Sequence, residues 1–441
     1  MIPDREPASP QRSIWRVYVE APALRMAVLG FAAGLPLLLI YGTLSFRLRE
    51  AGIERSAIGF LSWIALAYPF KWVWAPMLDR VAIPVLTRRM GRRRSWLLLA
   101  QCAVIVGLLL MAQFDPQRDL ALLAACALFT AMAGATQDIA LDAYRIESAA
   151  VERQAALAAA YQTGYRIGMI WAGAGALWIA AREAGGDTYQ HEAWAFSYSV
   201  MAASMLVGMV AVVWSPEAPV VDAVGATGAT ARGQARLLEP FIDFVRRYRW
   251  HAVLLVALVS SYRFANIVMG VMANPFYHDI GFTKDQVAAV SKFYGLLMAL
   301  AGGFVGGALT LRWGIGRMMW VAALAASSSI LLYAGLAARG PDLVLLIVAV
   351  STDNFAEGIA GTVFIAFLSG LTNRAYSATQ YALLSSLTLL VPKIVAGFSG
   401  VAVDTIGYAA FFCGCAASGT LALAALWATQ RFVPGQSLSK R

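Results

Sequence analysis

The chain has 441 residues, of which 60% are hydrophobic and only 14% are charged, whereas a soluble chain carries about 25% charged residues. This composition excludes an ordinary water-soluble protein, and the long unbroken apolar runs exclude a β-barrel, whose strands alternate in hydropathy. The net charge of +10 does not indicate a nucleic-acid partner, because the basic residues lie between apolar runs, as in membrane proteins. We predict an all-α membrane protein.

Runs of about 20 apolar residues follow one another along the chain and predict about twelve transmembrane helices. They are expected at residues 23–46, 56–77, 95–113, 120–144, 155–181, 194–214, 251–277, 285–310, 317–337, 342–370, 377–401 and 405–429. Residues 1–16 are polar and contain three prolines, so residues 1–22 are predicted to be a cytoplasmic tail rather than a cleavable signal. Residues 431–441 are expected as a second cytoplasmic tail.

The segment 215–250 divides the predicted spans into an N-terminal bundle at 23–214 and a C-terminal bundle at 251–430. Its first part is rich in Pro, Gly, Ala and Thr, which indicates a flexible cytoplasmic linker. Its second part, Leu237–Trp250, has apolar residues on one helical face and arginines beside it, which is typical of an amphipathic helix on the inner leaflet. The alternative is that this part simply begins the seventh span.

The distribution of charge predicts the orientation of the chain. Most of the 35 Lys and Arg residues fall in segments that face the cytoplasm if both termini are inside, as the positive-inside rule requires. The halves also repeat weakly, because Asp138 and Asp142 of the fourth span recur at the same spacing as Asp353 and Glu357 of the tenth. Two parallel six-helix pseudo-repeats are therefore expected.

Charged residues inside the predicted spans are the strongest functional signal. Each would cost at least about 2.5–3.5 kcal/mol against lipid, so they must pair with one another or line an internal cavity. A conduit or carrier is the expected function. Basic residues outnumber acidic ones, which favours an anionic small-molecule substrate, unless every basic residue pairs with an acid. The charged residues are Lys71, Asp138, Asp142, Arg166, Arg263, Lys292, Asp353, Glu357 and Lys393.

Asp138 and Asp142 are four residues apart and share one helical face. Proton coupling is one interpretation, since a carboxylate within a membrane gains from taking up a proton. A structural ion pair with Lys71 or Arg166 is the other, and for Asp142 the two interpretations stand equal. Near the midpoints of their spans, Arg166 and Arg263 are expected first for substrate contact.

Nothing in the sequence points to an enzyme, a metal or a cofactor. Cys413 and Cys415 have the wrong spacing for a zinc pair, the histidines have no ligand companions, and neither a P-loop nor a serine-nucleophile motif occurs. A membrane enzyme or sensor is the alternative class, and catalytic turnover of a bound ligand without net transport would favour it. We predict a secondary active transporter, monomeric, whose partners are its substrate, protons and membrane lipids.

Six segments, spread over both halves, carry a resemblance to a known family. They are Gly30–Pro36, Ala67–Arg80, Gly91–Trp96, Ala135–Tyr144, Tyr165–Met169 and Ser377–Ser385. With most spans of both halves, these segments resemble the AmpG permease family of the major facilitator superfamily. The resemblance implies the major facilitator fold and proton-driven import of cell-wall breakdown products across the bacterial inner membrane by alternating access.

The family's usual substrates are anhydro-muropeptides, which are GlcNAc–anhydroMurNAc with or without peptide. Their import feeds peptidoglycan recycling and, in some bacteria, β-lactamase induction. A siderophore, acyl-CoA or another anionic metabolite is the alternative cargo, because a fold does not fix a substrate. By motif position the resemblance implies polar site residues at Lys71, Gln137, Asp138, Asp142, Arg166, Lys292, Asp353, Asn354 and Gln380. The spans themselves add Tyr161, Tyr165, Arg263, Asn266, Glu357 and Lys393 as substrate-binding candidates.

Overall fold

A computed structural model describes residues 14–54, 57, 61–185, 189–218, 233–282 and 284–432, and every regular element in these ranges is helical. The elements of the first half begin with η1 (Ile14–Val19), α1 (Ala21–Ile40), α2 (Gly42–Glu50), η2 (Ser62–Ala67), η3 (Lys71–Val73), α4 (Ala75–Arg80) and α5 (Leu86–Met90). They continue with α6 (Arg92–Gln113), α7 (Leu120–Ser148), η4 (Val151–Arg153), α8 (Gln154–Ile170), η5 (Trp171–Gly175), α9 (Ala176–Ala184), α10 (His191–Ser204) and α11 (Leu206–Trp214).

The second half has the same all-helical character. Its elements are α12 (Gly233–Tyr248), α13 (His251–Ser261), α14 (Phe264–Asp279), α15 (Lys284–Val287), η6 (Ala288–Tyr294), α16 (Gly295–Arg339), α17 (Leu343–Leu371), η7 (Arg374–Tyr376), α18 (Ser377–Ala396) and α19 (Ser399–Phe432). Residues 219–232 of the predicted linker lie outside the described residues. A turn at Arg249, whose φ is positive at 52°, separates α12 from α13.

Nine helical segments in the described ranges are long and apolar enough to cross a membrane. Three differences separate this number from the twelve predicted spans. The segment containing α16 holds two spans, divided at Gly314, whose φ of 81° is not helical. The fifth span runs continuously through α8, the π-helical η5 and α9, and it is not among the nine.

The second predicted span, 56–77, is the third difference, because its described part is not one continuous α-helix. It consists of short 3-10 turns, η2 and η3, followed by α4. Pro69 and Pro76 lie in this stretch, and a proline cannot donate the backbone hydrogen bond of a helix interior. The local chain therefore departs from a regular helix at a position where hydropathy alone predicts one.

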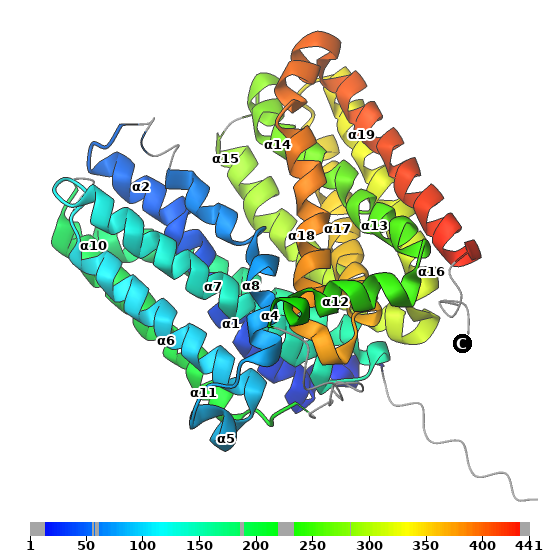
Figure 1. Cartoon of the computed structure of the whole chain (residues 1–441). Helices are drawn as coiled ribbons and strands as arrows, with labels where there is room; N and C mark the ends of the chain where they lie inside the picture. The colour runs from blue at the N-terminus through cyan, green and yellow to red at the C-terminus, as the bar shows by residue number, and fades with distance from the viewer. Residues whose placement is uncertain are drawn as a thin grey trace, which may run out of the picture.

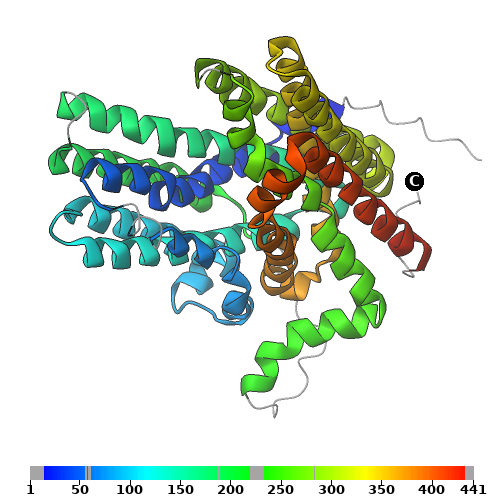
Figure 2. The ribbon, with the colours of Figure 1, turned by 90° about the horizontal axis from the view of Figure 1, so that it is seen from above.

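The two halves form two separate groups of helices (Figure 1). Those of the first half, coloured blue to teal, lie on one side, and those of the second half, coloured green to red, on the other, also when seen from above (Figure 2). The halves meet at the end formed by α4, η4, η7 and α12, here called the closed end. They spread apart toward the opposite end, formed by α2, the α6–α7 loop and the tip of α14, here called the open end (Figure 1).

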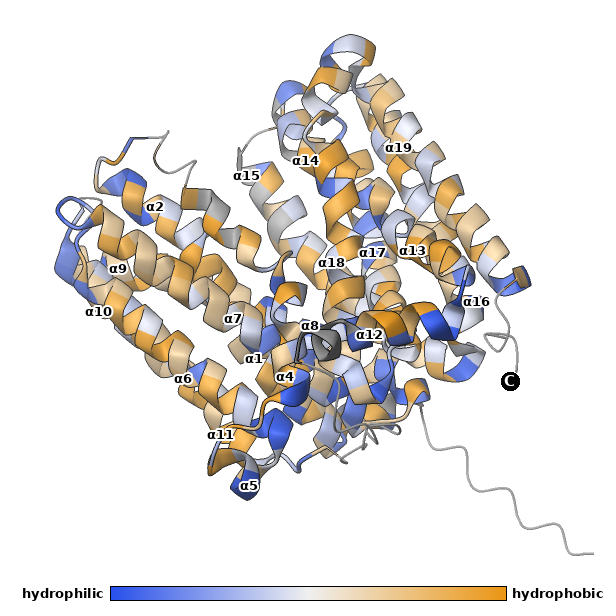
Figure 3. Cartoon of the chain, viewed as in Figure 1, coloured by the Kyte–Doolittle hydropathy of each residue, from blue (hydrophilic) through white to orange (hydrophobic). Residues whose placement is uncertain are grey.

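Hydrophobic residues prevail along the helices, and hydrophilic ones concentrate at α5 and in part of α12 (Figure 3). Large apolar residues such as Leu99, Val106 and Leu122 are exposed, as expected where lipid rather than water covers a helix. Inside each half, glycines allow close helix contacts. Gly164 of α8 lies against the Ala27 carbonyl of α1, so these two backbones approach as small-residue membrane helices do.

Candidate functional site

Irregular segments occur at corresponding positions of the two halves. The second span contains the 3-10 turns η2 and η3, and the eighth contains the π-helical η6, which follows α15. Interrupted helices at equivalent positions of a repeat point to the binding site of a transporter. Each of the two segments carries a predicted lysine, Lys71 in η3 and Lys292 in η6, although the Lys292 side chain lies outside what the structure describes.

A cavity of about 680 Å³, the central cavity, lies between the halves. Four predicted residues line it: Lys71, Asp138 and Tyr165 from the first half and Lys393 from α18 of the second half. Most of the remaining lining is apolar, with Tyr41 and Tyr68 among it. The central cavity therefore combines opposite charges with aromatic walls at the boundary between the two halves.

Asp138 and Asp142 both lie on the buried face of α7 but have different partners. The Asp142 carboxylate lies 3.7 Å from Lys71 Nζ and 3.4 Å from Arg145 Nη2, so it takes part in ion pairs. Asp138 lines the central cavity, and its Oδ1 is buried without a hydrogen-bond partner among the described residues. The two acids that look equivalent in sequence are therefore distinct in their surroundings.

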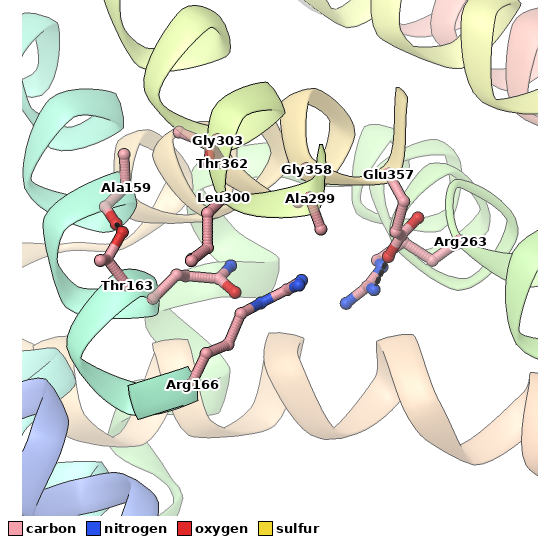
Figure 4. Close-up of a pocket in the computed structure, with 12 residues that line it drawn as sticks. Ala159, Thr163, Arg166, Arg263, Ala299, Leu300, Gly303, Glu357, Gly358 and Thr362 are labelled. Carbon is pink, nitrogen blue, oxygen red and sulfur yellow. Dashed lines mark hydrogen bonds and ion pairs between the residues drawn. The ribbon is translucent and has the colours of Figure 1, made fainter. Parts of the chain in front are cut away.

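Arg166 of α8 and Arg263, at the turn between α13 and α14, line a second, small space of about 20 Å³. Their guanidinium groups point toward one another across the boundary between the halves (Figure 4). Arg263 Nη2 donates to Glu357 Oε1, whereas no ion pair or hydrogen bond to the Arg166 side chain occurs within the described part of the chain. Two cations facing one gap, with only one carboxylate between them, are suited to an anionic group.

A third space of about 210 Å³, the side pocket, adjoins this arginine pair on the side of the second half. Arg263 and Glu357 line both spaces, and the side pocket adds Asn266, Asp353 and Asn354. Asp353 Oδ1 accepts a hydrogen bond of 2.9 Å from Ser329. The predicted residues of the second half therefore lie together here, apart from the central cavity.

Besides Asp142, three of the described predicted residues line none of these spaces. Tyr161 packs beside Tyr165, with ring centroids 5.8 Å apart. Both amide atoms of Gln137 are buried and have no hydrogen-bond partner among the described residues. Gln380 lies at the closed end, where its amide accepts from Arg247 at 2.8 Å and donates to Asp243 at 2.8 Å, both on α12. The structure therefore places Gln380 as a connection between α18 and α12.

The closed end contains a buried charge network that the span analysis did not single out. Arg93, 1% exposed, donates to Asp79 at 2.7 Å, to Glu147 at 2.6 Å and to Ser377 of the second half at 2.9 Å. Asp79 in turn accepts from the backbone N–H of Thr379 at 2.9 Å, and so caps the first turn of α18. The sequence does contain a signal for this network, because Asp79 and Gly91–Arg94 lie in segments of the family resemblance. By themselves, however, basic residues in a loop indicate only the orientation of the chain in the membrane.

Helix α12 adds a second connection across the closed end. On the side of the first half, Arg80 of α4 donates to Glu239 at 3.0 Å, and Trp72 meets Phe241 edge-on. On the side of the second half, α12 is hydrogen-bonded to Gln380 through Arg247 and Asp243. Within the described residues, no group of three or more His, Cys, Asp or Glu side chains is placed to hold a metal ion.

Two helical halves that enclose charged spaces and, over the described residues, spread apart toward one end are typical of a membrane transporter of the secondary active class. Sequence comparison agrees, because the family model for the Major Facilitator Superfamily matches residues 26–369. A putative transporter AmpG 4 of Rickettsia conorii is 32% identical over 90% of this chain and 94% of its own length. An anhydromuropeptide permease of Escherichia coli is 31% identical over 90% of this chain and 77% of its own length.

The chain belongs to the major facilitator superfamily and, within it, to the AmpG-like permease family. It is a transporter and not an enzyme. Solved structures confirm the fold at low sequence identity. The fucose transporter FucP in the outward conformation has a TM-score of 0.70 at 15% identity, covering 93% of this chain and 99% of its own. The proton:xylose symporter XylE has a TM-score of 0.68 at 15% identity, covering 95% and 96%.

Proposed function

We propose that this transporter imports anhydro-muropeptides, GlcNAc–anhydroMurNAc with or without peptide, across the bacterial inner membrane in symport with protons. Both termini face the cytoplasm in this proposal, so the closed end is the cytoplasmic end. The observation that carries it is the central cavity, in which Lys71, Asp138 and Tyr165 of one half face Lys393 of the other. The relatives named AmpG and anhydromuropeptide permease support the choice of substrate class.

The substrate part of the proposal rests on charge and on aromatic surface. Arg166 and Arg263 face one another between the halves (Figure 4), and guanidinium groups bind carboxylates strongly. In the central cavity Tyr68 and Tyr165 offer aromatic surfaces on which a sugar ring can lie. A molecule with a disaccharide at one end and carboxylates at the other matches both regions.

The proton part rests on Asp138. Its buried Oδ1 has no partner within the described residues, and an unpaired carboxylate is costly in a membrane interior. Proton uptake removes that cost, so Asp138 is the proposed coupling residue. Asp142 already has Lys71 and Arg145 as partners. Its proposed role is to share these basic partners with Asp138, so that they pair with one carboxylate or the other as Asp138 gains or loses its proton.

Uptake of radiolabelled anhydro-muropeptide into proteoliposomes tests the proposal. We expect accumulation that requires an inward pH gradient and collapses with a protonophore. The absence of uptake would contradict the proposed substrate. Uptake that the pH gradient does not affect would contradict the proposed proton coupling. Uptake of a siderophore or an acyl-CoA in place of the muropeptide replaces the substrate while leaving the transporter assignment intact.

A further inference from the structure

The side pocket differs from the central cavity in its balance of charge. Its charged residues are Arg263, Asp353 and Glu357, and Asn266 and Asn354 are among its neutral polar ones. Arg263 is paired with Glu357, so a second carboxylate, that of Asp353, remains with no cation against it among the described side chains. A pocket of this kind is not complementary to a simple anion.

Both hydrogen-bond donors and acceptors of the side pocket are left without partners among the described residues. Arg263 Nε and Glu357 Oε2 are buried and without hydrogen-bond partners among the described residues. Asp353 accepts only the Ser329 hydroxyl there, which leaves its other oxygen for a ligand. The pocket thus offers a guanidinium donor beside two carboxylate acceptors, and unsatisfied groups of this kind cost free energy until a ligand pairs with them.

The size of the side pocket limits what it can hold. Its volume of about 210 Å³ corresponds to about seven water molecules at about 30 Å³ each. That space suits one amino-acid-sized group. It adjoins the gap that Arg166 lines, because Arg263 and Glu357 border both spaces.

We propose that the side pocket binds a zwitterionic amino-acid end of the substrate, with its carboxylate against Arg263 and its ammonium against Asp353. The inference rests on the proposed function and deepens it, because it assigns the sugar and the peptide of one substrate to different regions. Sugar binding belongs to the central cavity, and the side pocket favours substrates whose peptide ends in a diamino acid with a free ammonium group.

The test compares the apparent KM for uptake of three labelled compounds. They are the disaccharide alone, the disaccharide with a peptide ending in a diamino acid, and the same compound with its free ammonium acetylated. For the wild type we expect the lowest apparent KM with the free ammonium. Asp353→Asn removes the charge but keeps an oxygen for Ser329, and should raise the apparent KM for that compound, relative to the disaccharide, by about tenfold or more.

The acetylated compound controls for general damage to the protein. Because it has no free ammonium, it should lack the low apparent KM already in the wild type, and Asp353→Asn should not change its apparent KM relative to the disaccharide. Asp404→Asn, at an exposed position of α19, is the matched control and should leave the ratio of the apparent KM values as in the wild type. Equal preference of the wild type for the free and acetylated compounds, or an unchanged ratio in Asp353→Asn, overturns the inference while uptake of the disaccharide still supports the proposed function. Uptake of none of the three overturns the proposed function and this inference with it.

Discussion

Asp138 and Asp142 occupy successive turns of α7, yet only Asp142 has basic side chains within ion-pair distance. Asp138→Asn keeps the shape of the side chain and removes its capacity to carry a proton. We expect this variant to lose accumulation driven by a pH gradient while it still exchanges labelled for unlabelled substrate at equal concentrations. Gradient-driven accumulation at the wild-type level would remove Asp138 from the coupling mechanism, and Asp404→Asn serves as the control.

Arg166 is the guanidinium in the arginine pair that no described residue neutralises. Arg166→Ala should raise the apparent KM for an anionic muropeptide by about tenfold or more, since a charge-assisted hydrogen bond is lost. Arg166→Lys should restore only part of the affinity, because lysine lacks the planar fork. Arg182→Ala, at an exposed position of α9, is the control. An unchanged apparent KM in Arg166→Ala would assign the residue a structural role.

The contact between α1 and α8 shows how whole elements are placed. Gly30 and Gly34 of α1 lie against the Tyr161 and Tyr165 backbones of α8, and Gly164 lies against Ala27. This close packing sets the position of the helix that carries both Tyr165 and Arg166. The two site residues therefore depend on glycines that never contact the cavities.

Gly164→Ala should lower the free energy of unfolding by about 1–3 kcal/mol, because the new methyl group meets the α1 backbone and forces the helices apart. Thermal unfolding of the purified protein in detergent measures the change. Gly414→Ala is the matched control, since nothing lies within 4 Å of a Cβ built at that glycine of α19. Equal unfolding temperatures for the two variants would contradict the proposed tight contact.

At the scale of the whole molecule, the closed end joins the halves through Arg93. Arg93→Ala leaves Asp79 and Glu147 buried without their shared cation, which typically costs about 3–5 kcal/mol. We expect a clearly lower unfolding temperature than that of Arg89→Ala, which removes an exposed arginine from α5. If both variants unfold at the wild-type temperature, the network does not stabilise this conformation.

The proposed orientation makes a prediction for intact cells. In a variant without the native cysteines, Gln117→Cys lies in an exposed loop at the open end and Arg89→Cys on α5 at the closed end. A membrane-impermeant maleimide added outside spheroplasts should label Gln117→Cys only, and both positions after lysis. Labelling of Arg89→Cys in intact spheroplasts would reverse the orientation.

Much of this architecture was predictable from the sequence, because hydropathy in a membrane is a local property of each segment. The all-helical fold, the two halves and the charged residues of the spans all follow from it. The departures of the second span from a regular helix were less accessible. Pro69 and Pro76 indicate that the helix is interrupted, but hydropathy averaged over a span does not show where a helix breaks.

Among the charged residues, sequence indicated which ones must avoid lipid, and only the tertiary structure decided which of them meet. Arg93 contacts Ser377, 284 residues away, and Arg47, which follows directly after the predicted first span, is fully buried and donates to the Met111 carbonyl. Gln380 contacts α12 rather than a cavity. Each partner comes from a distant segment, so no local pattern encodes the pairing, whereas the cost of a charge in lipid is fixed by the residue alone.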